Sequence, residues 1–181
     1  MGAGAQVTSD PESIRRADKV ILPGVGAFAD AIAELRRTGL DEAFREAVRA
    51  GKPCLGVCLG LQLLFDVSEE DGEHVGLGLL PGRVVRFRPV PGLPIPHMGW
   101  NTLRIRREVP MLTGLGPDPS VYFVHSYHAV PARADDVIAE ADYPDPFAAV
   151  VGRDNLLACQ FHPEKSQKVG LAMYARFAGM A

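Results

Sequence analysis

Two short apolar runs in the first third of the chain each end in glycines and then pass into a helical pattern. "KVILPGVGAF" starts with a strand-like run at residues 20–22, and "KPCLGVCLG" starts with another, "KPCLGV", at residues 52–57. Strand, glycine-rich loop and helix, repeated along a chain, are typical of a parallel sheet with crossover helices. The pattern therefore predicts an α/β fold. In such a fold both loops lie at the carboxyl ends of strands, where ligands bind.

Helices are expected after both loops. Apolar spacing predicts one helix from Phe28 to a stop at Gly39, and a second that is capped by Asp41 and ends at Gly51. "LGLQLLFDV" is expected to form a helix directly after Cys58, and "AQVTSD" near the start could form a short strand.

The second half consists mainly of short β-like runs that are separated by proline and glycine. They include "WNTLRI", "VYFVHSYHAV", "DVIAEA", "PFAAVV" and "LLACQF", and "GRDN" between the last two is a natural hairpin turn. "SQKVGLAMYARFAGM" predicts a final helix with Ser166 as its candidate cap. We expect residues 1–181 to form a single domain, with a flavodoxin-like, mostly parallel central sheet flanked by helices and with antiparallel strands added to it.

Composition excludes several classes of protein. The net charge of −3 gives no electrostatic footprint for nucleic acid or an anionic membrane. No apolar run approaches the roughly 20 residues that span a bilayer. Three cysteines are too few for a disulfide framework, so the cytoplasm is the expected compartment.

Cys58 lies between Gly56 and Gly60 in a G-x-C-x-G pattern, at the expected junction of a strand and a helix. This is the thiol version of the nucleophile elbow, a strained turn that projects one side chain clear of the sheet. The amides of the following helix would favour a thiolate at this position. A small buried cysteine in a tight glycine turn remains the alternative, and Cys54, which lacks this context, is expected in the core.

A cysteine nucleophile needs a base, and "CQFHPEKS" offers one. His162 follows a buried run, and Glu164 is two residues further on, so in extended geometry both side chains leave the strand on one side. A carboxylate beside an imidazole fixes its tautomer and raises its basicity. A surface His–Glu pair at a strand end is the alternative.

A metal site and a phosphate loop are not expected. His125 and His128 would point to opposite faces of one strand, so no set of four zinc ligands forms, and we expect these histidines to be structural or to line a site. "GVCLGLQ" lacks the Lys-Ser/Thr pair of a phosphate loop. "PGVGAF", by contrast, places small residues between a strand end and a helix, which suits an oxyanion hole as well as helix initiation.

Three segments occur in the order "PGVGAF", G-x-C-x-G and His-Pro-Glu. In this order they resemble class I (triad-type) glutamine amidotransferases. More narrowly, "GLGLLPGRVVRF", "PHMGWNTL", "YFVHSYHA" and "CQFHPEKSQ" resemble the glutaminase subunits of imidazole glycerol phosphate synthase, in histidine biosynthesis. The resemblance covers nearly the whole chain. It implies a glutamine amidotransferase fold, hydrolysis of L-glutamine to glutamate and ammonia, and no cofactor or metal.

The resemblance also assigns roles to residues. The implied triad is Cys58, His162 and Glu164. The implied oxyanion and glutamine-binding residues are Gly24, Val25, Gly26, Leu59, Gln62, Ser126 and Tyr127. The implied partner is a cyclase subunit with a (β/α)₈ barrel, which forms a heterodimer with this chain and uses the ammonia to make imidazole glycerol phosphate and AICAR. The residues that match the side facing that barrel are Met98, Trp100, Asn101, Tyr122 and Lys165. From the sequence alone, Trp100 could equally be a lid on the core of this chain.

The start of the chain departs from the family pattern. Members normally open with a strand and a "DYGxGN"-type turn leading into a first helix, whereas "MGAGAQVTSD" corresponds to the approach to their second strand. We expect a start codon assigned too late rather than a truly shortened form, because the triad is intact. The chain as written should then be poorly soluble or unstable, and upstream residues should rescue it.

Two alternative functions stay open at this point. The chain could be the glutaminase subunit of another amidotransferase, or a regulatory subunit that keeps the fold without turnover.

Overall fold

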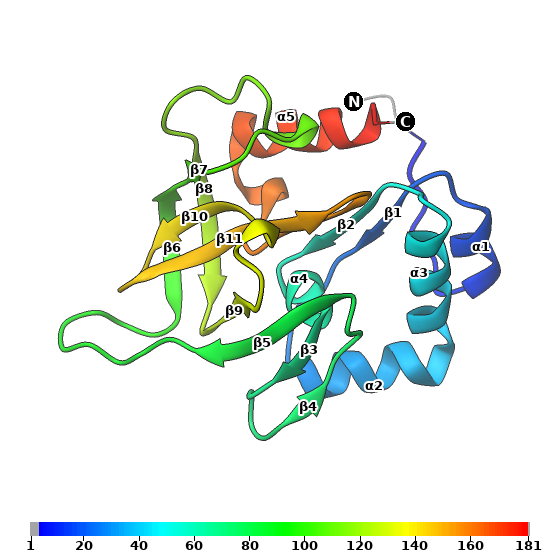
Figure 1. Cartoon of the computed structure of the whole chain (residues 1–181), viewed down its shortest axis with the longest axis horizontal. Coiled ribbons are helices and arrows are strands. Elements are labelled where there is room, and N and C mark those ends of the chain that lie inside the picture. The colour runs from blue at the N-terminus through cyan, green and yellow to red at the C-terminus, as the bar shows by residue number, and fades with distance from the viewer. Residues whose placement is uncertain (1–3, 181) are drawn as a thin grey trace.

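The computed structural model describes residues 4–180, and its centre is a six-stranded sheet (Figure 1). The strands lie in the order β1-β2-β12-β11-β10-β7. Their bounds are Val20–Leu22 (β1), Cys54–Val57 (β2), Leu156–Cys159 (β12), Pro146–Arg153 (β11), Val137–Asp142 (β10) and Arg104–Ile105 (β7). β2 pairs in parallel with both β1 and β12, and every pair from β12 to β7 is antiparallel. The predicted α/β fold with added antiparallel strands is confirmed, but the central sheet is mixed rather than mostly parallel, since only its β1-β2-β12 side is parallel.

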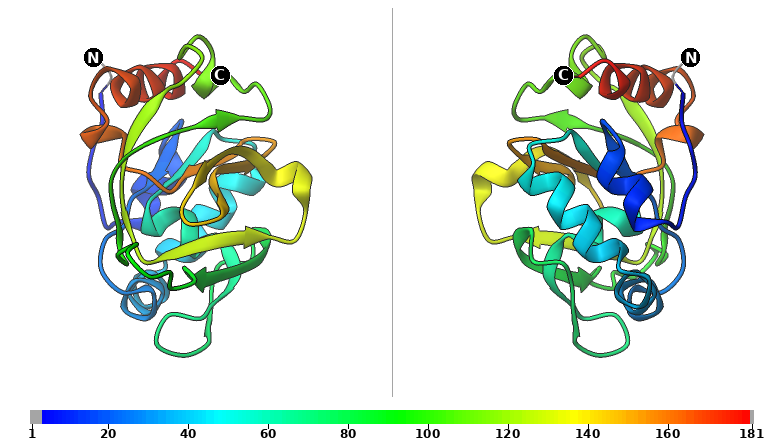
Figure 2. Two further views of the ribbon diagram at one scale, coloured as in Figure 1. Left: turned by 90° about the vertical axis from the view of Figure 1, so that its left-hand side faces the viewer. Right: turned by 90° about the vertical axis from the view of Figure 1, so that its right-hand side faces the viewer.

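Each face of this sheet carries its own apolar core, because successive strand residues point to opposite faces. On β2, Leu55 and Val57 belong to a core that includes Met173 and Phe177 of the last helix. Cys54 points to the other core, which the helices before β2 also line. Figure 2 shows the last helix at the top and α2 end-on near the bottom in both views.

Five α-helices within residues 4–180 surround the sheet. Their bounds are Pro11–Arg16 (α1), Phe28–Thr38 (α2), Leu40–Arg49 (α3), Leu59–Leu63 (α4) and Gln167–Ala178 (α5). Gly39 ends α2 with φ 72°, as predicted, but the same residue occupies the N-cap position of α3, so the prediction that Asp41 caps α3 is wrong. Asp41 lies in the first turn of α3, where a carboxylate is still favourable.

The described residues also form two smaller sheets besides the central one. A four-stranded sheet has the order β4-β3-β5-β9, and β6 pairs with β8 in a two-stranded sheet. The bounds are Phe65–Ser68 (β3), His74–Val75 (β4), Leu80–Arg86 (β5), His97–Thr102 (β6), Ser120–His125 (β8) and Tyr127–Pro131 (β9). Short 3₁₀ helices cover Pro110–Leu112 (η1), Ala134–Asp136 (η2) and Pro163–Lys165 (η3).

Two other expectations about local structure are wrong. The helix after Cys58 ends at Leu63, and Phe65–Ser68 forms a strand because it pairs with β4 and β5. "AQVTSD" forms no strand in the described structure, where it leads without regular structure into α1. No helix within residues 4–180 has the length and apolar character needed to cross a membrane.

Candidate active site

Cys58 occupies a strained turn between β2 and α4. Its backbone has φ 56° and ψ −111°, a conformation that residues other than glycine rarely adopt. A Cβ atom added to Gly56 would lie 2.9 Å from the carbonyl oxygen of Gly60, and one added to Gly60 would lie 1.9 Å from that of Leu22. The flanking glycines are therefore required by close backbone packing, and the predicted sharp turn is confirmed.

The thiol of Cys58 is buried and protonated at neutral pH. Burial raises its pKa to about 11, although the Leu59 N–H and the charge of Lys165 act in the opposite direction. The Leu59 N–H, at the start of α4, favours a thiolate as expected, but it does not bring the pKa down to neutral pH. α4 is only 5 residues long, and its effect is smaller than the cost of desolvating the charge. A nucleophilic Cys58 needs a base to take its proton.

His162 follows β12, the parallel neighbour of β2, and so lies at the same edge of the sheet as Cys58. Nδ1 of His162 is 2.7 Å from Oε1 of Glu164. A carboxylate can only accept, so Nδ1 carries the hydrogen and Nε2 of the neutral ring keeps its lone pair. The pair forms because residues 163–165 turn in η3, and not through the extended geometry that we expected.

Several contacts hold His162 in place. Its backbone N–H donates to the carbonyl oxygen of Tyr122 at 3.0 Å. Its own carbonyl oxygen accepts a hydrogen bond from Oγ of Ser166 at 2.6 Å. Ser166 occupies the N-cap position of α5, as expected. Its hydroxyl, however, bonds to His162 and makes no capping hydrogen bond to the helix. Only 5% of His162 is exposed, so its ring is fixed and largely shielded from water.

The structure also brings the segment after β12 close to Cys58. The N–H of Cys58 donates to the carbonyl oxygen of Cys159 at 2.8 Å. The charges of Glu164 and Lys165 are close enough to act on the Cys58 thiol, Glu164 raising and Lys165 lowering its pKa. The residues predicted to form a triad therefore share one edge of the sheet.

The predicted oxyanion loop, residues 24–26, lies against the start of α4. A Cβ atom added to Gly24 would be 2.9 Å from Cβ of Leu59 and 3.3 Å from the backbone nitrogen of Gly60. Gly26 has φ 92°, which glycine adopts without strain, and Val25 is exposed. The loop of residues 24–26 is therefore in close contact with Leu59 and Gly60, which begin α4.

Gln62 and Tyr127 are in direct contact beside the cysteine. Nε2 of Gln62 donates to the carbonyl oxygen of Tyr127 at 3.0 Å and to Oε1 of Gln160 at 3.1 Å. Nε2 of Gln160 in turn lies 3.9 Å from Sγ of Cys58. Ser126, between β8 and β9, accepts a hydrogen bond from the backbone of Phe87.

Gln160 is a site residue that sequence reasoning missed. It is fully buried, beside the thiol. The available signal was an amide side chain inside the otherwise apolar run "LLACQF", because buried amides need hydrogen-bond partners.

His125 and His128 do not point to opposite faces of one strand, as we expected. A bend at Ser126 interrupts the strand, so His125 ends β8 and His128 belongs to β9. Both rings contact Phe87, with ring centroids 5.1 and 4.6 Å away. No group of three potential metal ligands occurs among the described residues.

The residues expected to face a partner lie largely on one surface. Met98 and Trp100 project from β6 and are 62% and 48% exposed, and the Trp100 ring contacts Tyr122 of β8 in a T-shaped arrangement. Trp100 is therefore not a lid on the core. Lys165 is also exposed, whereas Asn101 uses its amide to bind Asp142 of the same chain.

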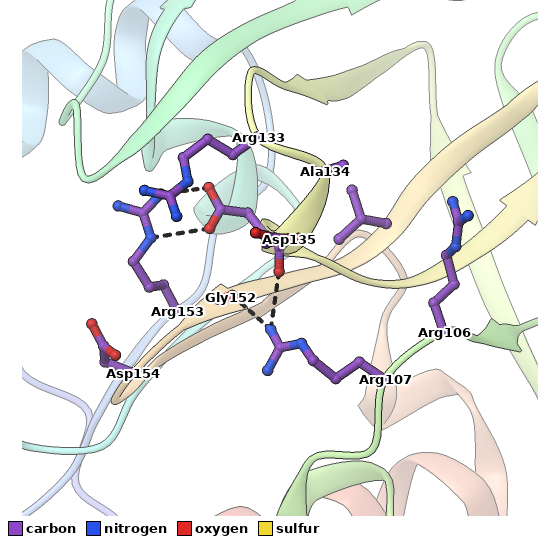
Figure 3. A pocket seen from close by; sticks show the side chains of 10 residues that line it. Arg106, Arg107, Arg133, Ala134, Asp135, Gly152, Arg153 and Asp154 are labelled. Carbon is purple, nitrogen blue, oxygen red and sulfur yellow. Dashed lines mark hydrogen bonds and ion pairs between the residues drawn. The ribbon is translucent and has the colours of Figure 1, made fainter.

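A separate hollow of about 590 Å³ lies beside the β11–β12 turn, at the opposite end of β12 from His162 (Figure 3). Arg106, Arg107 and Arg153 in its lining are held by neighbours of the same chain. Arg153 binds both carboxylate oxygens of the buried Asp136, and Arg107 donates to two backbone carbonyl oxygens. Its lining residues, 106–107, 133–137 and 152–154, include none of the residues of the candidate active site.

Residues 5–178 match the family model "Glutamine amidotransferase class-I". The chain belongs to this family of enzymes. Solved structures agree at the level of the fold: a crystal structure of a glutamine amidotransferase has a TM-score of 0.73 at 23% identity, covering 97% of this chain and 87% of that one. PurLQS from Thermotoga maritima has a TM-score of 0.68 at 19% identity, covering 90% of this chain and 79% of that one.

Within the family, the chain belongs with the HisH subunits of imidazole glycerol phosphate synthase. It is 52% identical to that subunit from Syntrophotalea carbinolica, over 99% of this chain and 90% of the relative. It is 49% identical to the subunit from Salinibacter ruber and 51% identical to that from Geobacillus thermodenitrificans. Both of these matches cover 99% of this chain, with 85% and 86% of the relatives.

Proposed function

We propose that this protein hydrolyses L-glutamine to glutamate and ammonia, as the glutaminase subunit of an imidazole glycerol phosphate synthase. The observation that carries the proposal is the placement of Cys58 and the His162–Glu164 pair at the ends of two neighbouring parallel strands. Family membership supports the same reaction.

In the proposed reaction, Cys58 is the nucleophile and His162 the proton carrier. Because the thiol is protonated at rest, His162 takes its proton as sulfur attacks the side-chain amide carbon of glutamine. His162 then gives that proton to the leaving nitrogen, which departs as ammonia and leaves a glutamyl thioester. Water, deprotonated by His162, hydrolyses the thioester, and the thiol is restored. Glu164 orients the imidazole throughout.

Backbone amides stabilise the oxyanion of both steps. The proposed donors are the N–H of Leu59 and an N–H of the adjacent loop, residues 24–26. The glutamine head group is held by Gln62 and by the segment of Ser126 and Tyr127. Both hydrogens of the Gln62 amide nitrogen are used within the protein, so its Oε1 can accept from the α-amino group of the substrate.

The ammonia is used by a partner. The relatives are named as synthase subunits, and we propose a heterodimer with a cyclase subunit of (β/α)₈ barrel fold, to which the ammonia is channelled. The products there are imidazole glycerol phosphate and AICAR. The exposed side chains of Met98, Trp100 and Lys165, with the half-buried Tyr122, form the proposed contact surface. A half-exposed tryptophan on a strand suits an interface anchor. All three thiols of the chain are free, which suits the cytoplasm.

A glutaminase assay with and without the cyclase subunit tests the proposal. Wild type should release glutamate, and Cys58→Ala should reduce the rate by at least about 10³-fold in both conditions. Cys54→Ala, which changes a buried cysteine on the other side of the same strand, is the control and should keep turnover. A folded wild type with no turnover in the presence of the partner would favour a regulatory subunit. Co-elution of the Trp100→Ala variant with the cyclase subunit tests the proposed contact surface. Binding as strong as that of wild type would exclude this surface.

A further inference from the structure

A chain of hydrogen bonds crosses the interior from β6 to the Cys58 thiol. It starts at Asn101, whose Nδ2 lies 3.4 Å from Nε2 of His97. Nδ1 of His97 lies 3.4 Å from Nε2 of His125, and Nδ1 of His125 lies 2.8 Å from the carbonyl oxygen of Tyr127. That oxygen also accepts from Gln62, which reaches the thiol through Gln160.

The carbonyl oxygen of Tyr127 fixes the hydrogen-bond directions of the part of the chain that contains the two histidines. A carbonyl oxygen can only accept, so Nδ1 of His125 carries a hydrogen and its Nε2 accepts. Nδ1 of His97 must then donate to that nitrogen, and Nε2 of His97 accepts from the amide of Asn101. The amide of Asn101 is itself oriented, because its oxygen accepts from the N–H of Thr102 at 2.8 Å. Every member has a single consistent role.

Both imidazoles are buried and held by packing. His97 and His125 are 4% and 6% exposed. The His97 ring stacks on Phe123 at 4.8 Å and on Tyr143 at 4.0 Å. Burial lowers the pKa of His97 to about 4 and that of His125 to about 3, so both rings are neutral, as the hydrogen-bond directions require.

We propose that His97 and His125 are positioning residues that set the geometry of the glutamine pocket. His125 holds the carbonyl oxygen of Tyr127, which fixes the backbone between β8 and β9 and gives Gln62 its partner. His97 links this support to β6, the strand that carries Met98 and Trp100. The inference rests on the proposed glutaminase function and adds residues that touch neither the thiol nor its base.

Binding of L-glutamine to proteins that carry Cys58→Ala measures this role without turnover. His125→Phe keeps an aromatic ring but removes both hydrogen bonds, and should weaken binding about 10-fold or more. His125→Asn keeps a donor where Nδ1 lies and should recover binding to within about 3-fold of the parent. His97→Asn keeps the donor toward His125 and should weaken binding only about 2- to 3-fold.

His128→Phe is the matched control. It changes a half-buried histidine that stacks on Phe87 but has no bond in the chain, so binding should be unchanged. Thermal unfolding identifies variants that do not fold, and the two asparagine variants carry the test if the phenylalanine variants fail. In proteins with Cys58 intact, His125→Phe should raise KM with kcat changed less than about 3-fold.

Two results separate the inference from the function on which it rests. If wild type turns over glutamine and His125→Phe binds it as tightly as the parent, or no more weakly than His128→Phe does, the positioning role is wrong and the glutaminase stands. An asparagine variant no better than His125→Phe would have the same meaning. If wild type neither binds nor hydrolyses glutamine, both proposals are wrong.

Discussion

Gly60, in the first turn of α4, packs directly on the backbone of Leu22 at the end of β1. A Cβ atom at this position would lie 1.9 Å from the Leu22 carbonyl oxygen, a contact that only backbone movement can relieve. This close approach brings the first glycine-rich loop to the turn that carries Cys58.

Gly60→Ala should therefore destabilise the protein. Forcing a methyl group against backbone costs about 1–3 kcal/mol, which corresponds to a fall in Tm of roughly 2–12 °C for a chain of this size. Differential scanning calorimetry provides the measurement. Gly4→Ala is the control, because its Cβ meets nothing within 4 Å, and equal Tm values for the two variants would contradict the packing argument.

The turn at Cys58 could be predicted because its determinants are local. Glycines two residues before and after Cys58, between an apolar run and a helical pattern, define the geometry whatever the rest of the chain does. The pairing of His162 with Glu164 was likewise readable from a spacing of two residues, although the 3₁₀ turn that forms it was not.

The remaining features depend on contacts between distant segments. Phe65–Ser68 continues the apolar pattern of α4, and only its pairing with β5 makes it a strand. The raised pKa of Cys58 results from burial beneath several elements, which no local pattern reports. Gln160 and His97 gained their roles through partners about a hundred and about thirty residues away, so spacing along the chain could not reveal them.

Glu164→Gln should reduce glutaminase turnover roughly 10- to 100-fold. The amide can donate to Nδ1 of His162 and so favours the tautomer in which Nε2 carries the hydrogen and cannot act as a base. The expected loss is smaller than for a buried carboxylate because the Glu164 side chain is 49% exposed. Tyr174→Phe removes only a 3.4 Å contact to the other carboxylate oxygen and serves as the control. Steady-state kcat measures both variants, and equal losses would contradict the orienting role.

Cys58 should react slowly with iodoacetamide at neutral pH. Its pKa of about 11 means that the thiolate fraction rises about tenfold per pH unit from pH 7 to about 10, where an ordinary cysteine levels off near 8.5. Mass spectrometry of the labelled peptide gives the rate at each pH. The Cys58→Ala protein shows the background, which should be low because Cys54 and Cys159 are also buried thiols with raised pKa. A rate that levels off at pH 8.5 would contradict a desolvated thiol.

Acid should destabilise the fold through the buried histidines. The pKa values of His97 and His125 in the folded protein are about 4 and about 3, whereas an unfolded histidine titrates near 6.5. Between these values the unfolded chain binds protons that the folded chain does not, so stability present above pH 6.5 is lost as the pH falls toward 4 and 3. Chemical denaturation from pH 7 to pH 4.5 measures this slope. Replacing His125 with Phe should make the slope shallower by the contribution of about one proton, even if the variant is less stable at pH 7, because the group that titrates has gone. An unchanged slope would show that His125 titrates in the folded protein as it does in the unfolded chain, and would contradict the lowered pKa.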